Sequence, residues 1–562
     1  MTKNSYGVFD LSWQAAEHPE WADQVKAEIQ EIRGRIQATH HRPLRYLIWA
    51  GMGGSVEDKS MYQAVGLLRR GVRFYALDST DPAKLKYILE DLQRRTGLAL
   101  PAILRSTLVV GMAMGMTSYE PVVNLEKLAA LYDRYKIDSR PNFLYLTLPG
   151  SLLDQFAGAR GYRRVELQLD GANTTAGRHS GPLTRGSLYP LALAGVDLHA
   201  WMQDAVLDEE EIYCAWKLAA FLHAQGAAGR DKVGLLLPRA WSGAALWTKQ
   251  DFEESLGKCE DSGIKMVIQE KPKLADYRSP KDAAQDRVFL AVRVKDTPDG
   301  NAEKVALLRR AGYPVAQVTL RAHALLSHYM QLVHYTVFGL GYLRGMNFVT
   351  QPSVELYKSI ANRVHAEAGK AGGIEKAKDW IALRESPKQA RWRGMVTLYY
   401  DCCEVEPEEA KAGAPSIYAA ILKRLAQTGR IQYGELTFFG DTRYSPKGKQ
   451  MRKVLDRAAE RLFRSRLKMP VDVYEGPAMN HSYHEMIIGH GKCFSTVLVS
   501  EAQEHLAAAG YRADYHLAQF LATKLALEER HRAVVALVVK DLGERSLTAL
   551  GEFFQQAAAG LK

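Results

Sequence analysis

The stretch that decides the fold is Arg45-Tyr46-Leu47-Ile48-Trp49-Ala50-Gly51-Met52-Gly53-Gly54-Ser55. Its first six residues are mostly aliphatic or aromatic, as in a buried strand, and they run straight into a glycine-rich turn. Backbone N–H groups of such a turn can hold an anion, but a tight turn between strand and helix needs glycine in any case. The spacing G-x-G-G-S lacks the third glycine of a dinucleotide fingerprint and the Lys-Ser/Thr ending of a P-loop. The stretch therefore predicts a strand–turn–helix unit and leaves the purpose of the glycines open.

Short apolar runs separated by helix-length segments continue outward from this stretch. The first series continues with residues 72–77, 107–110, 143–147 and 165–169. The second series comprises residues 233–237, 264–268, 288–292 and 315–319. Such alternation is typical of parallel sheets that are covered by helices on both faces. We therefore predict an α/β fold with two tandem, doubly wound parallel-sheet sandwiches and extra helices, in which the late runs 494–499 and 533–539 close the second sheet.

The same pattern suggests a division of the chain into domains. Residues 1–40 are expected to form an N-terminal helical segment, 41–225 the first α/β domain and 226–365 the second. Residues 366–470 have a mixed pattern that indicates an insertion with helices, and residues 471–562 are expected to complete the second domain.

The composition is that of a globular protein. A length of 562 residues is too great for one ordinary core, while 47% hydrophobic and 24% charged residues exclude wholesale disorder. No uncharged apolar stretch of about 18 residues occurs, and the first residues lack the apolar run of a signal peptide, so we expect a cytoplasmic protein with no membrane partner. The five cysteines are an odd number and include no C-x-x-C pair, which argues against a disulfide framework or a zinc ribbon.

The net charge of +11 is compatible with a nucleic acid, a membrane surface or a small anionic substrate as partner. Basic residues are densest between Lys447 and Lys468, and from Arg452 onward they alternate with apolar residues at about helical spacing. This pattern favours a solvated amphipathic helix over a polyanion-binding site. No RNA-binding aromatic signature or zinc finger accompanies it, so no nucleic-acid partner is expected.

Hydroxyl and ionisable side chains follow several of the predicted strands. Thr117 and Ser118 lie after the third strand, where they can bind a phosphate or cap the next helix. Arg178 lies after the fifth strand, where its permanent charge and fixed fork of donors suit an anion or a developing enediolate, or a salt bridge within the loop.

Three later segments, 252–258, 351–358 and 480–485, each hold an ionisable residue among turn or capping residues. The last of them begins a group of possible metal ligands: His481, His484, Glu485 and His490. Their H-x-x-H-E order is not the H-E-x-x-H helix pair of zinc enzymes, so the sequence does not favour a metal site.

Taken together and in this order, the segments resemble the glucose-6-phosphate isomerase family, which is built from two sugar-isomerase domains. They are most similar to the isomerase part of bacterial transaldolase–isomerase fusions. The likeness runs from about residue 45 to residue 540. It rests on G-x-G-G-S at 51–55, Gly-Arg-x-Ser at 177–180 with Ala176 in place of a first glycine, Glu-Ser-x-Gly-Lys at 254–258, Gln-Pro-x-Val-Glu-x-x-Lys at 351–358 and an aromatic strand at 433–439.

The resemblance implies sugar-isomerase domains and an aldose–ketose isomerase that interconverts glucose 6-phosphate and fructose 6-phosphate through a cis-enediol(ate). It assigns the base to Glu254, stabilisation of the enediolate to Arg178, and opening of the pyranose ring to His481 and Lys358. A carboxylate suits the first role because burial can bring the pKa of a glutamate toward neutrality, so that one proton can be taken and returned.

The resemblance also implies a binding site for a small-molecule sugar phosphate. The residues that would form it are Gly53, Gly54, Ser55, Thr117, Ser118, Gly177 and Gln351. No metal or organic cofactor is implied. Family members are commonly dimers with the active site at the domain and subunit interface, which leaves a homodimer possible.

The sequence departs from the family pattern in two places. The phosphate loop Ser-Lys-Thr-x-Thr-Thr is here Ala-Met-Gly-Met-Thr-Ser at 113–118, so that two hydroxyls and the lysine are replaced. The segment His-Ser-Thr-Gly-Gln is here His-Ser-Tyr-His-Glu at 481–485. Two alternatives therefore stand beside the first hypothesis: an isomerase for a different sugar or sugar phosphate, and a non-catalytic regulator that binds a sugar phosphate.

Overall fold

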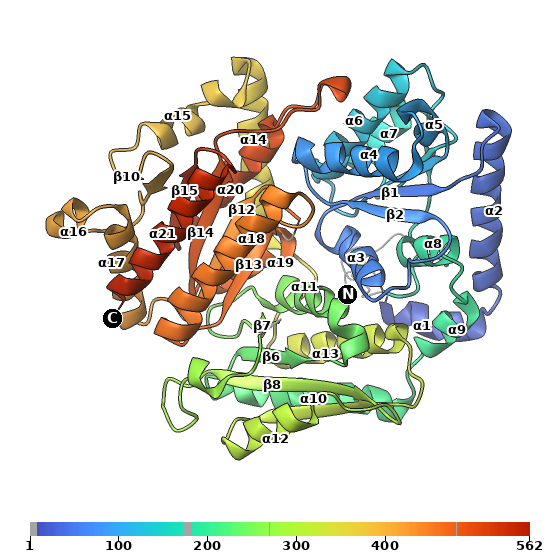
Figure 1. Cartoon of the computed structure of the whole chain (residues 1–562). Coiled ribbons are helices and arrows are strands. Elements are labelled where there is room, and N and C mark those ends of the chain that lie inside the picture. The colour runs from blue at the N-terminus through green and yellow to red at the C-terminus, as the bar shows by residue number, and fades with distance from the viewer. Residues whose placement is uncertain (1–7, 172–180, 269, 479, 562) are drawn as a thin grey trace.

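The computed structural model describes residues 8–171, 181–268, 270–478 and 480–561. Within these residues the strands form three sheets, each flanked by helices, and the three α/β units surround a common centre (Figure 1). The predicted α/β class with parallel sheets is confirmed. None of the helices in the described ranges combines the length and apolarity needed to cross a bilayer.

The first sheet has the strand order β2-β1-β3-β4-β5, and its strands are parallel. Its strands are β1 (Tyr46–Ala50), β2 (Arg73–Leu77), β3 (Thr107–Ala113), β4 (Phe143–Thr147) and β5 (Arg163–Arg164). The helices before and between them are α1 (Val8–Glu17), α2 (Trp21–His40), α3 (Glu57–Ala64), α4 (Pro82–Thr96), α5 (Leu100–Arg105), α6 (Glu120–Arg134) and α7 (Leu152–Ala159). Helices α8 (Arg185–Leu193) and α9 (Leu198–Asp204) follow the sheet in sequence.

The fifth strand is shorter than predicted and ends before residues 165–169. The reason is Arg185, whose backbone N–H donates to the Leu167 carbonyl at 2.9 Å and whose guanidinium donates to the Glu166 and Gln168 carbonyls at 3.2 and 2.7 Å. Because α8 takes these carbonyls, they cannot continue the ladder with β4.

The second sheet has the order β7-β6-β8-β9, again with parallel strands. Its strands are β6 (Lys232–Leu236), β7 (Lys265–Val267), β8 (Arg287–Val294) and β9 (Val315–Leu320), all within one or two residues of the predicted runs. Its helices are α10 (Glu209–Ala227), α11 (Ala245–Leu256), α12 (Ala302–Arg310) and α13 (Leu326–Leu343).

The third sheet is a correction to the predicted fold. Residues 494–499 and 533–539 do not close the second sheet, because they pair with strands from the interval read as an insertion, in the order β10-β11-β15-β14-β12-β13. The strands are β10 (Gln389–Trp392), β11 (Val396–Tyr399), β12 (Tyr433–Phe439), β13 (Val471–Gly476), β14 (Cys493–Ser500) and β15 (Ala533–Val539). Pairings β10–β11 and β11–β15 are antiparallel, and the others are parallel.

Helices cover both faces of this third sheet (Figure 1). They are α14 (Pro352–Ala371), α15 (Lys378–Arg384), α16 (Pro407–Lys411), α17 (Ala414–Gln427), α18 (Pro446–Ala459), α19 (Asn480–His484), α20 (Asp514–Glu529) and α21 (Glu544–Gly560). The basic stretch forms α18 and a wider π-helical turn over Glu460–Leu467, with Met451, Leu455 and Phe463 buried. The predicted amphipathic helix is confirmed.

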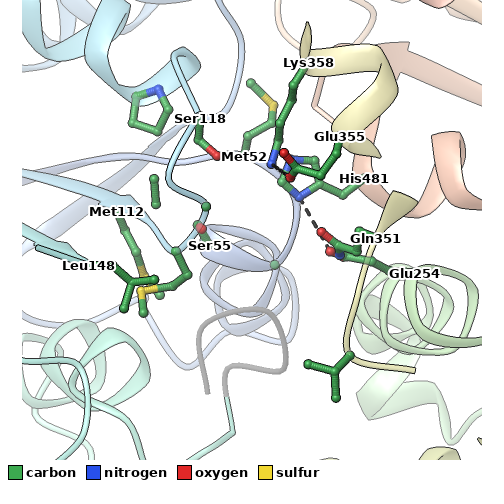
Figure 2. A pocket seen from close by; sticks show the side chains of 16 residues that line it. Met52, Ser55, Met112, Ser118, Leu148, Glu254, Gln351, Glu355, Lys358 and His481 are labelled. Carbon is green, nitrogen blue, oxygen red and sulfur yellow. Dashed lines mark hydrogen bonds and ion pairs between the residues drawn. The ribbon is translucent and has the colours of Figure 1, made fainter. Parts of the chain in front are cut away.

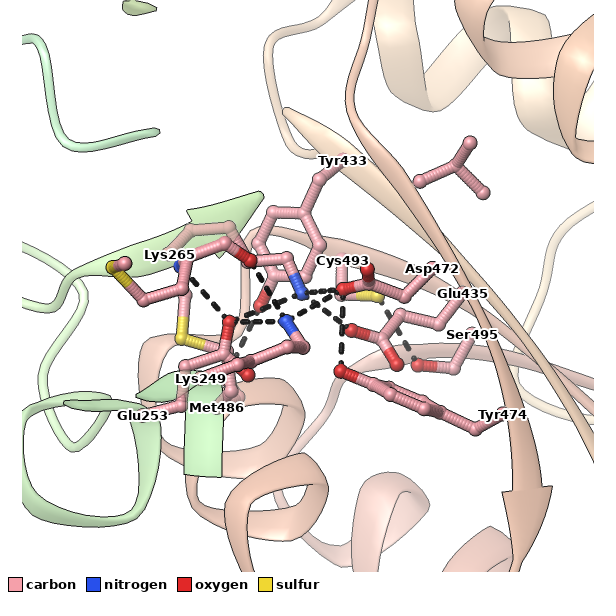
Figure 3. Close-up of polar contacts among 12 residues, drawn as sticks. Lys249, Glu253, Lys265, Tyr433, Glu435, Asp472, Tyr474, Met486, Cys493 and Ser495 are labelled. Carbon is pink, nitrogen blue, oxygen red and sulfur yellow. Dashed lines mark hydrogen bonds and ion pairs between the residues drawn. The ribbon is translucent and has the colours of Figure 1, made fainter. Parts of the chain in front are cut away.

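Five buried ionisable side chains connect the second unit to the third (Figure 3). The Lys249 ammonium contacts the Glu253 carboxylate and lies 2.7 Å from Asp472 Oδ2. The Lys265 ammonium lies 2.8 Å from Glu435 Oε1 and also contacts Asp472. Burial raises the pKa of Glu435 to about 8 and also raises the pKa of Glu253, in both cases against the effect of the two lysines.

This cluster fixes α11 relative to β13, which leads toward α19. Removing one member of a buried, paired group costs about 3–5 kcal/mol, because its partner is left with an uncompensated charge. The two segments that carry Glu254 and His481 are therefore held in a fixed relation.

Candidate active site

A cavity of about 220 Å³ lies where the three units meet (Figure 2). The first unit contributes Met52, Gly54, Ser55, Met112, Ala113, Met114, Gly115, Ser118, Pro121 and Leu148, mostly from the loops after β1 and β3. Helix α11 contributes Glu254, the segment from Val349 into α14 contributes Gln351, Glu355 and Lys358, and α19 contributes His481. The cavity thus lies at the carboxyl ends of parallel strands, where open α/β sheets bind ligands.

Seven residues assigned to the site from the sequence line this cavity: Gly54, Ser55, Ser118, Glu254, Gln351, Lys358 and His481. They come from segments up to about 430 positions apart, and no local pattern requires that they meet. Their individual roles stay predictions.

Four assigned residues are not among the described residues that line the cavity, and one of them, Gly53, lies in the glycine turn against His481. Gly177 and Arg178 lie outside the described residues. Thr117 is exposed, and its hydroxyl donates to Glu355 Oε2 at 3.0 Å. Neither Thr117 nor Ser118 caps the next helix, since α6 begins at Glu120 after Tyr119 without a side-chain cap.

Glu254 and His481 form the central pair. Glu254 is 2% exposed in the last turn of α11, its Oε1 lies 3.6 Å from His481 Nδ1, and the Gln250 amide donates to its other oxygen. Nε2 of His481 is buried and has no hydrogen-bond partner among the described residues, and the same is true of Nε2 of Gln351. Since buried polar groups are nearly always paired, these two nitrogens indicate where a polar ligand binds.

The glycine turn holds the histidine in place. A Cβ atom on Gly53 would lie 2.7 Å from both Cγ and Nδ1 of His481, and Gly53 has a φ of +55°. Glycine therefore serves two needs here: it adopts the left-handed backbone and lets the imidazole lie against the main chain. The Trp49 indole fixes the end of the turn by donating to the Ser55 carbonyl at 2.9 Å.

The loop after β3 forms the other wall. A Cβ atom on Gly115 would lie 2.7 Å from Ser118 Oγ and 3.0 Å from Lys358 Nζ. The ammonium of Lys358 therefore lies close to the loop after β3, and a larger residue at position 115 would crowd it. Its carboxylate partner is Glu355, with Nζ and Oε1 3.0 Å apart.

Sequence reasoning missed two of the polar residues at the site. Glu355 belongs to the quoted Gln-Pro-x-Val-Glu segment but had no assigned role, and Gln250 lies one turn before Glu254 on the same helix. The i, i+4 spacing of Gln250 and Glu254 was the available signal for the second. The partner of Glu355, Thr117, is 238 positions away in sequence.

The histidines and the glutamate weighed as metal ligands have separate partners. His484 Nε2 lies 2.9 Å from Thr523 Oγ1, and His490 Nε2 lies 3.1 Å from Asp231 Oδ2. The Glu485 carboxylate caps α14 by accepting from two backbone N–H groups, at 3.0 and 3.1 Å. Among the described residues, no group of three or more His, Cys, Asp and Glu side chains could hold a metal ion.

Comparison with known proteins finds distant relatives that match part of the chain. No family model matches the chain. A glucose-6-phosphate isomerase of Prochlorococcus marinus is 25% identical over 267 residues, which cover 44% of this chain and 48% of the relative. One of Synechococcus sp. is 26% identical over 250 residues, covering 42% and 45%. The chain is distantly related to glucose-6-phosphate isomerases. The resemblance predicted from the motifs is thereby confirmed.

The relationship has a limited extent. The match spans about half the length of these glucose-6-phosphate isomerases. Among solved structures, a hypothetical protein of Thermus thermophilus has a TM-score of 0.48 at 22% identity, covering 65% of this chain and 91% of its own. A glucose-6-phosphate isomerase of Chlamydia trachomatis has a TM-score of 0.45 at 15% identity, covering 61% and 73%.

Proposed function

We propose that the chain is an aldose–ketose isomerase that interconverts glucose 6-phosphate and fructose 6-phosphate. The observation that carries this proposal is the Glu254–His481 pair at 3.6 Å, facing a cavity in which His481 Nε2 and Gln351 Nε2 lack partners among the described residues. The distant relationship to glucose-6-phosphate isomerases supports the choice of substrate.

In the proposed reaction, Glu254 takes the proton from C2 of the open-chain aldose. The C2–H bond breaks, a C1–C2 double bond forms, and the C1 oxygen takes over the negative charge of the enediolate. The proton of the C2 hydroxyl then passes to the C1 oxygen, and collapse of the enediolate returns the proton from Glu254 to C1 and leaves the carbonyl at C2. Burial of Glu254 keeps water away from this proton, because the carboxylate is 2% exposed.

The remaining residues would prepare the substrate. His481 and Lys358 would open the pyranose ring by moving protons to and from the ring oxygen and the C1 hydroxyl, and Arg178 would stabilise the enediolate. Ser55, Ser118 and the backbone N–H groups of the glycine turn would hold the phosphate.

A second candidate is an isomerase of the same type that acts on a different sugar or sugar phosphate. The observation that favours it is the altered loop: Ala113 and Met114 line the cavity where the family has a hydroxyl and a lysine. Each lost charge-assisted hydrogen bond is worth roughly 1.5–3 kcal/mol, so fructose 6-phosphate would bind weakly unless other groups compensate.

A coupled assay tests the proposal. Purified protein is supplied with fructose 6-phosphate, and glucose 6-phosphate is followed through an NADP-linked dehydrogenase. We expect turnover in the wild type and a loss of about 10²–10⁴-fold in Glu254→Gln. No turnover with fructose 6-phosphate, but turnover with another ketose phosphate, would favour the second candidate. Binding without any turnover would favour a non-catalytic regulator.

A further inference from the structure

Glu355 occupies a site built for an anion. The Thr117 hydroxyl donates to its Oε2 at 3.0 Å, and the Lys358 ammonium donates to its Oε1 at 3.0 Å. The donors come from two parts of the protein: Lys358 lies one turn further along α14, and Thr117 lies in the loop that corresponds to the family's phosphate loop. Figure 2 shows Glu355 and Lys358 at the cavity wall, with Ser118 pointing toward Lys358.

Lys358 carries the positive charge of this wall. It is the only lysine or arginine among the described residues that line the cavity. Its side chain is 3% exposed, and its ammonium lies beside Gly115, in space that the glycine leaves open. A dianionic phosphate in this cavity needs a cationic donor, and Lys358 is placed to supply it.

The two partners differ in how easily they can move. The Glu355 side chain is 52% exposed, whereas that of Lys358 is 3% exposed. The exposed carboxylate can rotate into water and keep its hydration, while the incoming phosphate takes its place beside the buried ammonium, so that this charge is not left without a partner. The ammonium of Lys358 is buried and cannot turn into water in this way. An incoming anion would therefore displace Glu355 and leave Lys358 in place.

We infer that Glu355 is a resident counter-anion that competes with the phosphate of the substrate for Lys358 and Thr117, and so sets the affinity for phosphorylated sugars. Two anions on the same two donors would repel each other, so the phosphate binds only after the carboxylate has left. Glu355 thus acts as a specificity residue: it lowers the affinity for every anionic ligand and spares neutral ones. The inference rests on the proposed function only in taking the ligand to be a sugar phosphate.

The test is the binding of inorganic phosphate, glucitol 6-phosphate and glucitol by calorimetry, without turnover. Glu355→Gln keeps the shape of the side chain and an oxygen that can accept from Thr117, but removes the competing charge. We expect it to bind both phosphate probes on the order of ten- to a hundredfold more tightly, the effect of about one charge-assisted hydrogen bond. Glucitol affinity should stay unchanged.

Two further variants sharpen the result. Glu367→Gln is the matched control, because Glu367 lies on the same helix in an exposed pair with Arg363 at 3.2 Å, and it should leave all three affinities unchanged. Lys358→Met should weaken both phosphate probes at least tenfold, and by a larger factor than it weakens glucitol.

The inference is overturned if Glu355→Gln leaves phosphate binding unchanged or weakens it, as a merely structural helix pair would, or if Lys358→Met binds phosphate as tightly as the wild type. Its failure is distinguishable from failure of the proposed function. Tighter phosphate binding in Glu355→Gln with no isomerase turnover would retain this inference and contradict the function. Isomerase turnover by the wild type, together with unchanged phosphate binding in Glu355→Gln, would support the proposed function and contradict this inference.

Discussion

Replacing Gly53 with alanine tests how the glycine turn positions the histidine. The new Cβ would lie 2.7 Å from Cγ and Nδ1 of His481, a distance that real contacts do not reach, so the ring has to move. The same Nδ1 lies 3.6 Å from Glu254 Oε1, and a shift of a few tenths of an ångström or more disturbs that pair. The φ of +55° adds a backbone cost of about 1–2 kcal/mol for any residue with a Cβ.

Gly97→Ala separates these two effects. Gly97 has a φ of +68°, it ends α4, and a Cβ there meets nothing within 4 Å. Both variants should therefore lose about 1–2 kcal/mol of unfolding free energy in urea titrations. Only Gly53→Ala should lose turnover as well, by about 10²-fold, because displaced catalytic groups cost roughly that factor. Full turnover in Gly53→Ala, or an equal loss in Gly97→Ala, would refute the role given to the turn.

Three other changes have defined outcomes. Because the pKa of Glu435 is raised to about 8 from 4.5, the folded protein keeps a proton that the unfolded chain loses; this stabilisation is complete below about pH 4.5 and is lost as the pH rises toward 8. Urea unfolding at pH 5.5 and 8 should show that decline in the wild type and a smaller one in Glu435→Gln, and parallel profiles would contradict it. Gly115→Ala should weaken phosphate binding several-fold in calorimetry, because its Cβ would lie 3.0 Å from Lys358 Nζ, whereas tighter binding would contradict the position given to that ammonium. Gln250→Met removes the amide that donates to Glu254 and should lower turnover about tenfold with unfolding free energy little changed; equal turnover would show that the amide does not position the base.

The first two sheets could be predicted because their strands are short apolar runs that end in turn residues. Three strands of the third sheet were also expected, at 433–439, 494–499 and 533–539, but their assembly with β10, β11 and β13 into a separate sheet was not. β12 shows why: its Glu435 is fully buried and contacts Lys265, which comes from a strand 170 positions away in another sheet. The hydrophobicity of residues 433–439 alone does not reveal a contact with such a distant residue.

In the candidate site, too, some residues could be predicted from the sequence and others could not. Residues that belong to contiguous motifs, such as Glu254 and Ser55, could be assigned from the sequence and do line the cavity. The use of Glu355 could not be predicted, because it depends on Thr117 from another unit and on the space beside Gly115. Both are consequences of packing, so they required the structure.

The most direct test of the central claim is proton exchange at the substrate carbon. The protein is incubated with fructose 6-phosphate in D₂O, and deuterium at C2 of the glucose 6-phosphate formed is followed by NMR. We predict incorporation by the wild type and a rate about 10²–10⁴-fold lower in Glu254→Gln, which should still bind 6-phosphogluconate. Incorporation at the wild-type rate in Glu254→Gln, or binding of the sugar phosphate by the wild type without any exchange, would contradict the assignment of Glu254 as the base of an isomerase.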